Sequence, residues 1–253
     1  MYTKESFAKV SREDLVEIAV IVLNSEYCEV KEAVVEKITD QGFLKEIVLS
    51  NKDFGVINIA LENLTAQEIL KEIALVNINW NVRRAVIKKI TDQDFLKKIV
   101  LSDEDWKIRA SAVENITDES FLKEIVLSDD YCMVRSKAVK NITDEEFLKE
   151  VILKDELIAV IETALQNITD EDFLKKIVLN NKYWYYKIRM VAVENIIDQD
   201  FLKEIALNDD DCVVRESAVK KITDEKYLKQ ISLKDKSEYV REAAIKRVRE
   251  LKN

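Results

Sequence analysis

The fold is decided by residues 90–116, which read ITDQDFLKKIVLSDEDWKIRASAVENI. The same pattern returns at residues 116–142 as ITDESFLKEIVLSDDYCMVRSKAVKNI. The threonine of the Ile-Thr-Asp motif, or the residue that replaces it, stands at Thr39, Thr65, Thr91, Thr117, Thr143, Thr169, Ile197 and Thr223. Successive positions are 26 residues apart, except for one step of 28 residues from Thr169 to Ile197. A fixed period in this range is typical of a stacked array of repeats.

Each repeat is expected to form two short helices joined by a tight turn. In the repeat that begins near Thr169, either this threonine or Asp170 caps the first helix, which we call helix A. Its apolar side is formed by Phe173, Leu174, Ile177 and Val178. The second helix, helix B, has in the repeat before that one an apolar side formed by Val134, Ala138, Val139 and Ile142. These spacings predict an all-α fold, an α-solenoid (α-α superhelix) of about eight to nine two-helix repeats.

The composition agrees with this architecture. The 253 residues include two glycines, no proline and no histidine, and the formal net charge is -9. We expect one α-solenoid domain over residues 1–253, with an N-terminal cap at 1–10, repeats at 11–248 and a C-terminal tail at 249–253. The acidic balance argues against non-specific binding to nucleic acid or to an anionic membrane, because both need local positive charge.

An arginine recurs within helix B. It stands at Arg83, Arg109, Arg135, Arg189, Arg215 and Arg241, with Lys31 in the first repeat. At about 100° per residue it falls inside the apolar arc of the helix, so its guanidinium needs a carboxylate or carbonyl partner. The acidic loop just upstream, with Asp129 and Asp130, offers candidates. We predict a ladder of Asp and Arg that links successive repeats and is interrupted where Ile57 and Ile161 replace the arginine.

The recurring pattern Asp-x-x-x-Val-Arg-x-x-Ala resembles the signature of HEAT-like repeats, and is closest to their short bacterial and archaeal forms. It is present at Asp130, Val134, Arg135 and Ala138, and again at Asp210, Val214, Arg215 and Ala218. The resemblance extends over residues 11–251 and implies that the B helices line a concave face. The usual HEAT unit is longer than the 26 residues found here, so a leucine-rich-variant type of α-solenoid is a neighbouring interpretation.

The sequence offers little for catalysis or metal binding. Histidine is absent, and we find neither a glycine-rich phosphate loop nor a Gly-x-Ser-x-Gly motif. Cys28, Cys132 and Cys212 lie four and three repeats apart, too far for a shared metal ion or a disulfide. We interpret them as small core residues in a reducing compartment. The protein is therefore expected to be no enzyme and to hold no metal and no cofactor.

A lysine recurs in the A helices. It stands at Lys45, Lys71, Lys97, Lys123, Lys149, Lys175, Lys203 and Lys229. Such a column could follow a phosphate backbone. We favour a solvated outer face, because Glu119 precedes Lys123 by four residues, the favourable order for a helical ion pair, and two later repeats share this arrangement.

The outward side of helix B is a better candidate for an interaction surface. The position two residues before the recurring arginine holds Met133, Val213 and Tyr239, and Met190 adds an apolar side chain from the next column. Apolar residues in a row on an exposed face indicate an interaction surface. We predict that these four residues contact a partner.

The seventh repeat is two residues longer than the others and carries Tyr183, Trp184 and Tyr185 before helix B. These aromatic residues are predicted to be binding anchors, with the alternative that the loop packs on its own repeat. Tyr186 takes the usual aromatic position at the start of helix B and is expected in the core.

Charged residues on the B-helix side have both signs. Arg84 and Lys88, with Lys89 and Lys107, form a local basic spot, whereas the first two repeats are acidic. A surface of mixed sign suits a protein or peptide better than a uniform polyanion.

The sequence therefore predicts a non-catalytic scaffold that presents its B-helix face to a protein or peptide of unknown identity. The alternative is a nucleic-acid-binding protein, since some HEAT-like proteins bind DNA and a few act on damaged bases. A third resemblance, to HEAT-like bacterial lyases that handle bilin chromophores, has no supporting residue. We find no signal peptide and no apolar run of membrane-spanning length, so a cytoplasmic protein without a membrane partner is expected.

Overall fold

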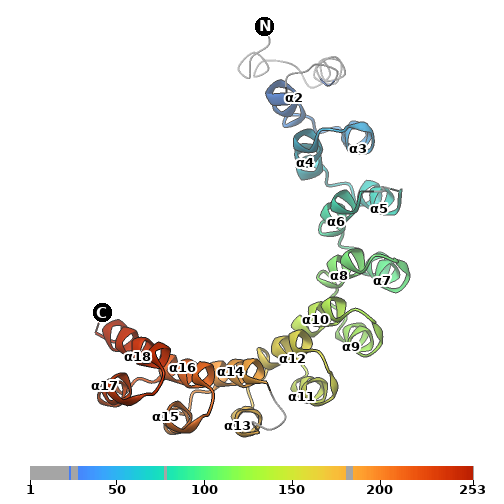
Figure 1. Ribbon diagram of the computed structural model, residues 1–253. Coiled ribbons are helices and arrows are strands. Elements are labelled where there is room, and N and C mark those ends of the chain that lie inside the picture. The colour runs from blue at the N-terminus through green and yellow to red at the C-terminus, as the bar shows by residue number, and fades with distance from the viewer. Residues whose placement is uncertain (1–22, 24–27, 77–78, 181–184, 253) are drawn as a thin grey trace. The chain divides into compact units, whose positions relative to one another are not determined.

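The repeated sequence folds into pairs of short helices (Figure 1). The computed structural model describes residues 23, 28–76, 79–180 and 185–252. These residues form 17 helices and no strand. The predicted fold class, an all-α solenoid of two-helix repeats, is confirmed. None of the helices in the described residues is long and apolar enough to cross a membrane.

Two kinds of helix alternate along the chain. The A helices are α3 (Gln41–Ser50), α5 (Gln67–Val76), α7 (Gln93–Ser102), α9 (Glu119–Ser128), α11 (Glu145–Lys154), α13 (Glu171–Leu179), α15 (Gln199–Asn208) and α17 (Glu225–Lys234). The B helices are α2 (Cys28–Val35), α4 (Phe54–Asn63), α6 (Trp80–Ile87), α8 (Trp106–Val113), α10 (Cys132–Lys140), α12 (Ile158–Leu165), α14 (Tyr186–Asn195), α16 (Cys212–Lys221) and α18 (Glu238–Glu250). Each A helix packs against the B helix that follows it. B helices pack against one another in the pairs α2 with α4 and α6 with α8, and from α10 through α12, α14 and α16 to α18.

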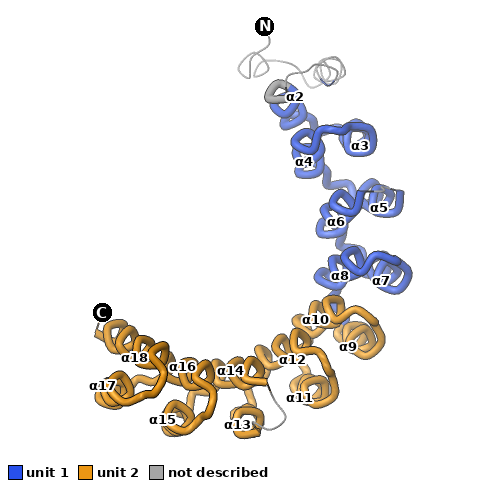
Figure 2. Tube along the Cα trace, viewed as in Figure 1, with its two compact units in different colours: residues 1–118 blue, residues 119–253 orange. Residues whose placement is uncertain are grey.

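The chain divides into two compact units, residues 1–118 and 119–253 (Figure 2). The first unit contains α2 to α8, and the second contains α9 to α18. The predicted N-terminal cap, residues 1–10, lies outside the described residues. At the other end, α18 continues to Glu250 and so extends into the residues that we assigned to the tail.

The core follows the apolar stripes that the sequence predicts. In α13, Leu174, Ile177 and Val178 are buried, whereas Phe173 is only half-buried. In and just after α10, the four predicted core residues of helix B are at most 1% exposed: Val134, Ala138, Val139 and Ile142. Burial of these side chains between successive repeats is the main force that holds the helices together.

Aspartate begins most A helices for a local reason. The carboxylate of Asp170 accepts a hydrogen bond from the backbone amide of Phe173 at 3.0 Å. This bond satisfies one of the amides that have no partner within the helix, and the negative charge lies at the positive end of the helix dipole. Of the two residues that the sequence left open, Asp170 and not Thr169 provides the cap. The same cap occurs at Asp40, Asp92, Asp144, Asp198 and Asp224.

The lysine column joins successive A helices. The ammonium of Lys149 lies 2.8 Å from the carboxylate of Asp170 in the next repeat and 5.8 Å from the centroid of the Phe173 ring. The equivalent ion pairs are Lys71–Asp92, Lys97–Asp118, Lys123–Asp144, Lys175–Asp198 and Lys203–Asp224. The predicted pair within one helix occurs for Lys123, whose ammonium lies 3.8 Å from Glu119. The sequence did not predict the additional pairs, in which the next repeat offers six of these lysines an aspartate at the start of its A helix.

The first residue of each A helix also reaches the next repeat. One oxygen of Glu145 accepts hydrogen bonds from the amides of Thr169 and Asp170, at 3.0 and 2.6 Å, and the other accepts one from the Thr169 hydroxyl at 2.8 Å. In the first compact unit the oxygen of the Gln93 side chain accepts the amide of Thr117 at 3.0 Å. The Ile-Thr-Asp motif is therefore held by the repeat that precedes it.

Side chains at the ends of the B helices bind carbonyl groups of the preceding B helix. The side-chain nitrogen of Asn63, Nδ2, donates to three backbone carbonyl oxygens at and just after the end of α2, at distances from 3.0 to 3.3 Å. Lys89 takes this place in the next repeat, where its ammonium donates to two carbonyl oxygens near the end of α4, at 2.6 and 2.8 Å. The last carbonyls of a helix have no partner within it, so each repeat completes the one before it.

We predict that acid weakens the array through the aspartate caps. The hydrogen bond from Lys149, together with the Phe173 amide, lowers the pKa of Asp170, and Lys71, Lys123 and Lys175 act in the same way on the caps that they bind. A carboxylate whose pKa is lower in the folded than in the unfolded chain stabilises the fold above the unfolded value. This contribution is lost as the pH falls through the folded value. The midpoint of urea unfolding should therefore decrease from about pH 5 to about pH 3.

The matched control for this prediction is Asp170→Asn, which keeps a capping oxygen without the charge. Its urea midpoint should start lower at neutral pH and decrease less on acidification than that of the unchanged protein. Equal acid responses of the two proteins would show that the Lys149–Asp170 pair does not contribute.

Candidate interaction surface

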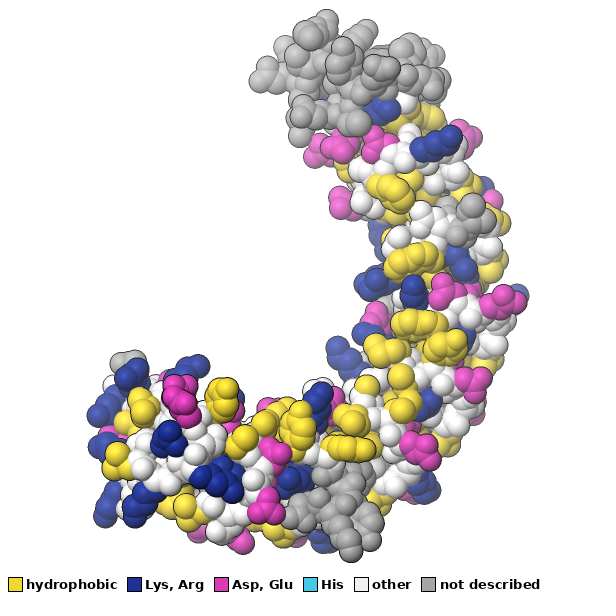
Figure 3. All heavy atoms as spheres, viewed as in Figure 1, with side chains coloured by type: hydrophobic (Ala, Val, Ile, Leu, Met, Phe, Trp, Pro, Cys, Tyr) yellow, Lys and Arg dark blue, Asp and Glu magenta, His cyan; other side chains and the backbone are white. Residues whose placement is uncertain are grey.

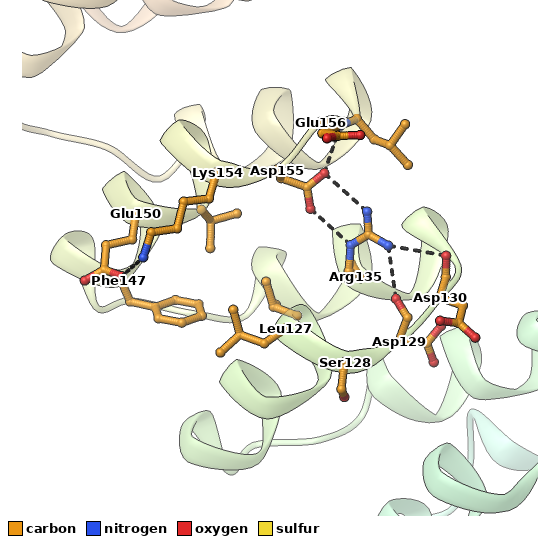
Figure 4. Close-up of a pocket in the computed structure, with 13 residues that line it drawn as sticks. Leu127, Ser128, Asp129, Asp130, Arg135, Phe147, Glu150, Lys154, Asp155 and Glu156 are labelled. Atoms are coloured by element: carbon orange, nitrogen blue, oxygen red, sulfur yellow. Dashed lines mark hydrogen bonds and ion pairs between the residues drawn. The ribbon is translucent and has the colours of Figure 1, made fainter.

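The recurring arginine of helix B lies between two repeats. The Nε and Nη2 atoms of Arg135 donate to the two carboxylate oxygens of Asp155 at 3.0 and 3.2 Å (Figure 4). Its Nη1 donates to the backbone carbonyl oxygens of Asp129 and Asp130 at 3.0 and 3.4 Å. Arg215 has the same arrangement, with its carboxylate at Asp235. Two further pairs of this kind are Arg83–Asp103 and Arg189–Asp209.

The carboxylate of each pair comes from the loop of the following repeat, and not from the upstream loop that the sequence suggested. The upstream loop supplies carbonyl oxygens instead, as Arg109 shows with Asp103 at 3.0 Å and Arg241 with Asp235 at 2.8 Å. The reason is geometric, because the guanidinium points out of its own repeat toward the end of the next A helix. These arginines are bound to groups of their own chain and leave little for a partner.

The residue 20 positions after the arginine changes together with it. Aspartate follows Arg83, Arg109, Arg135, Arg189 and Arg215 at this distance, whereas Lys31, Ile57 and Ile161 are followed by Asn51, Asn77 and Asn181. The side-chain oxygen of Asn51 accepts the amide of Asp53 at 2.8 Å, which is the turn bond that Asp103 forms with Asp105. Asparagine thus preserves the turn without a charge that would have no guanidinium partner. Asn77 and Asn181 lie outside the described residues.

Four B helices begin with a capping side chain. Asp53, Asn79, Asp105 and Asp211 each accept a hydrogen bond from the backbone amide two residues further on. Ser237 precedes α18 and has a hydroxyl that could cap, although it forms no such bond. Aspartate, asparagine and serine are the residues that helix starts prefer, so these repeats follow the general rule.

Three consecutive B helices depart from that rule. The residues before α10, α12 and α14 are Tyr131, Leu157 and Tyr185, and none of them forms a capping bond with its side chain. We call these three residues the uncapped row. Their exposed fractions are 50%, 43% and 69%. Because α10 packs against α12 and α12 against α14, the row lies on adjacent helices. Figure 3 shows hydrophobic side chains gathered over these helices.

A pocket adjoins the row between α9 and α11 (Figure 4). Leu127, Phe147 and Leu157 give it apolar surface, so one member of the row also lines the pocket. The pocket has five acidic residues, Asp129, Asp130, Glu150, Asp155 and Glu156, and two basic ones, Arg135 and Lys154. We call it the acidic pocket. Apolar surface and an excess of negative charge therefore occur together beside the row.

The structure places the predicted contact residues unevenly. Tyr185 belongs to the uncapped row, and Met133, which is 43% exposed, lies two residues after Tyr131. Met190 and Val213 are half-buried on α14 and α16. Tyr239 is 72% exposed on α18. Tyr183 and Trp184 lie outside the described residues, so their predicted role as anchors stays a prediction.

The predicted basic spot belongs to the first compact unit. Arg84 and Lys88 are exposed and stay predicted contacts. Lys89 is engaged with the carbonyl groups of α4, and burial lowers its pKa. The ammonium of Lys107 lies 4.4 Å from the centroid of the Trp80 ring. Two of the four basic residues are therefore held by contacts within the chain.

The interpretation of the first residue of helix B as a core position is wrong. Cys132 and Cys212 stand there with free, partly exposed thiols, and Tyr186 is 40% exposed. Phe54, at the same position of α4, is 60% exposed. The first residue of a helix lies at the open end of the B layer, where neighbouring helices cover it only in part. The side chain of Cys28 lies outside the described residues.

The sequence reasoning missed two members of the row, Tyr131 and Leu157. The sequence contains the signal that would have found them. The position before helix B holds aspartate, asparagine or serine in five other repeats, at Asp53, Asn79, Asp105, Asp211 and Ser237. The reasoning also missed a column of leucines near the ends of the A helices that are between 41% and 82% exposed: Leu49, Leu75, Leu101, Leu127, Leu153, Leu179, Leu207 and Leu233. This column recurs in every described repeat and so does not distinguish one place on the surface.

Comparisons with known proteins support the architecture alone. No protein-family model matches the chain, and no curated protein matches it. Among solved structures, a leucine-rich repeat variant with a novel repetitive structural motif is similar, with a TM-score of 0.57 and 20% sequence identity over 89% of this chain and 88% of that one. The X-ray structure of YibA from E. coli has a TM-score of 0.50 and 14% identity over 89% of this chain and 98% of that one. The chain is thus a helical repeat protein, similar in structure to a leucine-rich repeat variant.

We predict that the matched residues Arg215 and Asp235 act as a pair. Burial would raise the pKa of Asp235, but the hydrogen bonds from Arg215 and from the Ser237 amide, together with the nearby positive charges, offset it, so the pKa lies below its usual value. Arg215→Ile leaves this carboxylate, which is 8% exposed, without its cation and should destabilise by about 3 kcal/mol. Adding Asp235→Asn reproduces the Ile/Asn combination that the chain uses elsewhere and should recover part of the loss. Urea unfolding of both single variants and the double variant measures the coupling, and additive effects would contradict the pairing.

We also predict that capping the row raises stability. The variant Tyr131→Asn, Leu157→Asn, Tyr185→Asn gives α10, α12 and α14 the residue that Asn79 provides before α6, with no change in charge. Each new cap should contribute about 0.5–1 kcal/mol, so the thermal unfolding midpoint should increase. A decrease would mean that the row stabilises the B layer and is not an open surface.

Proposed function

We propose that the protein is a non-catalytic scaffold that binds a protein or peptide through the B-helix side of residues 119–253. The observation that carries this proposal is the uncapped row. Tyr131, Leu157 and Tyr185 replace capping residues in three consecutive repeats and expose apolar surface instead. Exposed apolar side chains in a row indicate an interaction surface, and tyrosine is enriched among the residues that contribute most to protein binding.

Stability alone does not account for the row. Loss of an N-cap side chain costs about 1 kcal/mol, so three losses in succession are a substantial fraction of a domain's stability. A structural gain would require the side chains to be buried against their neighbours, yet the exposed fractions are 43% or more. Contact with a partner would add burial that the chain itself leaves incomplete.

The row would bind a partner because the helices hold its three side chains at fixed distances from one another. The helices that carry them are tied by ion pairs and carbonyl caps, including Arg135 with Asp155 and Asn167 with the end of α10. A rigid array binds with little loss of its own conformational freedom, which favours affinity. The proposal includes the assignment to HEAT-like repeats, which rests on the Asp-x-x-x-Val-Arg-x-x-Ala motif.

A protein partner is favoured over nucleic acid by the state of the basic residues. Contacts to a phosphate backbone need available lysine and arginine side chains. In residues 119–253, Lys123, Lys149, Lys175 and Lys203 bind aspartates of the following repeat, and Arg135, Arg189 and Arg215 bind aspartates as well. Chromatography on heparin with a salt gradient tests this preference, and retention that persists to high salt would favour the nucleic-acid alternative.

The binding function is tested by selection from a library of random dodecapeptides displayed on phage. The unchanged protein is the bait, and the variant with Asn at positions 131, 157 and 185 is the counter-selection. We expect enriched peptides that bind the unchanged protein and lose at least about tenfold in affinity for the variant, which corresponds to about 1.4 kcal/mol. Substitution of Leu207→Asn, an exposed leucine of α15 outside the row, is the matched control and should leave binding unchanged.

Failure to enrich any peptide that discriminates between the two baits would contradict a role of the row in binding. Enrichment of peptides that depend on Leu207 instead would move the binding surface to the leucine column.

A further inference from the structure

We infer that the partner segment is an extended peptide that carries apolar side chains at every third residue and Lys or Arg between them. The inference rests on the proposed function, because it concerns the partner of the uncapped row. It follows from three features of the surface: the spacing of the row, the amide groups beside it that the row's side chains do not cap, and the charge of the acidic pocket.

The spacing of the row fits an extended chain. Packed helices lie about 8–10 Å apart, so Tyr131, Leu157 and Tyr185 should recur at roughly this distance. Three residues of extended chain span about 10 Å. A peptide that crosses α10, α12 and α14 can therefore place one apolar side chain at each member of the row.

The backbone beside the row favours an extended peptide over a helical one. In the capped B helices the cap side chain accepts the amide of the second helical residue, as Asp211 does for Val213. The corresponding amides in α10, α12 and α14 belong to Met133, Ala159 and Lys187, where the row offers no capping acceptor. An extended peptide has carbonyl oxygens that can accept such amides, whereas the carbonyls of a helix are already bonded within it.

The charge around the row favours a basic peptide. Asp130 and Glu156 directly precede Tyr131 and Leu157 in the sequence, and both are exposed. Both also line the acidic pocket together with Glu150. Arg135 is bound to Asp155, and Lys154 forms only an exposed pair with Glu150, which is weak in water. The local excess of carboxylates complements a cation.

The acidic character of this pocket varies among the repeats. In the equivalent pocket between α15 and α17, Asp209, Asp210 and Asp235 stand in place of Asp129, Asp130 and Asp155, but two other acidic positions change. There, Gln230 stands in place of Glu150 and Lys236 in place of Glu156. The fold thus tolerates either charge at these two positions, and both are acidic beside the uncapped row.

A lysine or arginine side chain suits both parts of the acidic pocket. Its aliphatic stem can cover Leu127, Phe147 and Leu157, while its charged end remains near Glu150, Glu156 and water. An arginine can in addition form paired hydrogen bonds with a carboxylate. The pocket therefore supplies the position for a basic residue between two apolar anchors.

The test uses three fluorescent dodecapeptides and fluorescence anisotropy with the full chain. The first peptide consists of four Leu-Arg-Ser repeats, the second of four Leu-Glu-Ser repeats and the third of four Ser-Arg-Ser repeats. We expect the first to bind about tenfold or more tightly than each of the others, with an affinity that decreases as salt is added. Equal binding of the acidic and basic leucine peptides would overturn the inference.

Two variants separate this inference from the proposed function. The pocket variant, Glu150→Gln with Glu156→Lys, copies the residues of the pocket between α15 and α17 and should fold normally. It should lose the preference for the basic peptide while binding to the leucine residues persists. The row variant, with Asn at positions 131, 157 and 185, should lose both leucine peptides. If only the row variant changes binding, the function stands and the basic partner is excluded; if neither variant changes binding, both are excluded.

Discussion

The structure depends on polar groups that one repeat leaves open and the next repeat closes. The pair of Arg135 and Asp155 is the clearest case, because Arg135 meets backbone carbonyl oxygens in its own repeat and finds a carboxylate in the next one. Lysine with aspartate on the A helices, and asparagine with carbonyl groups on the B helices, follow the same principle. Apolar burial drives the helices together, but these bonds fix the register at which one repeat meets the next.

Much of the architecture could be predicted from the sequence because the repeats confirm one another. The period, the two helices and the buried stripe with Val134 and Ala138 all follow from spacing. Long-range partners could not be predicted in the same way. The ammonium of Lys149 pairs with Glu146 of its own helix, which spacing can suggest, and also with Asp170 of the next repeat, which only the positions of both helices reveal. The acceptor of Arg135 was misplaced for the same reason, since the loop of the next repeat is closer in space than the helix wheel reveals.

The candidate site was predicted only in part. Tyr185 and Met133 were recognised as apolar residues on an outward side, whereas Tyr131 and Leu157 were not. An isolated exposed tyrosine carries little information, since apolar residues contribute much of any protein surface. The position becomes informative once the structure shows that the same place in other repeats holds a hydrogen-bonded cap, such as Asp211. The candidate interaction surface is therefore identified by residues that differ from the usual residue at their place in the repeat, more than by the repeating residues themselves.

The residue of helix B and the loop residue 20 positions after it form matched combinations, either arginine with aspartate or isoleucine with asparagine. These combinations determine which repeats of this chain can be exchanged for one another. A repeat with arginine in helix B needs an aspartate in the loop of the next repeat, as Arg135 has with Asp155. A repeat with isoleucine at that position, such as Ile161, is followed by asparagine. A recombination event that joined the first half of one combination to the second half of the other would bury a lone charge. The unit that must stay intact during evolution is thus the interface between two successive repeats. We expect insertion or deletion of whole repeats to be tolerated where the new interface again joins a matched combination.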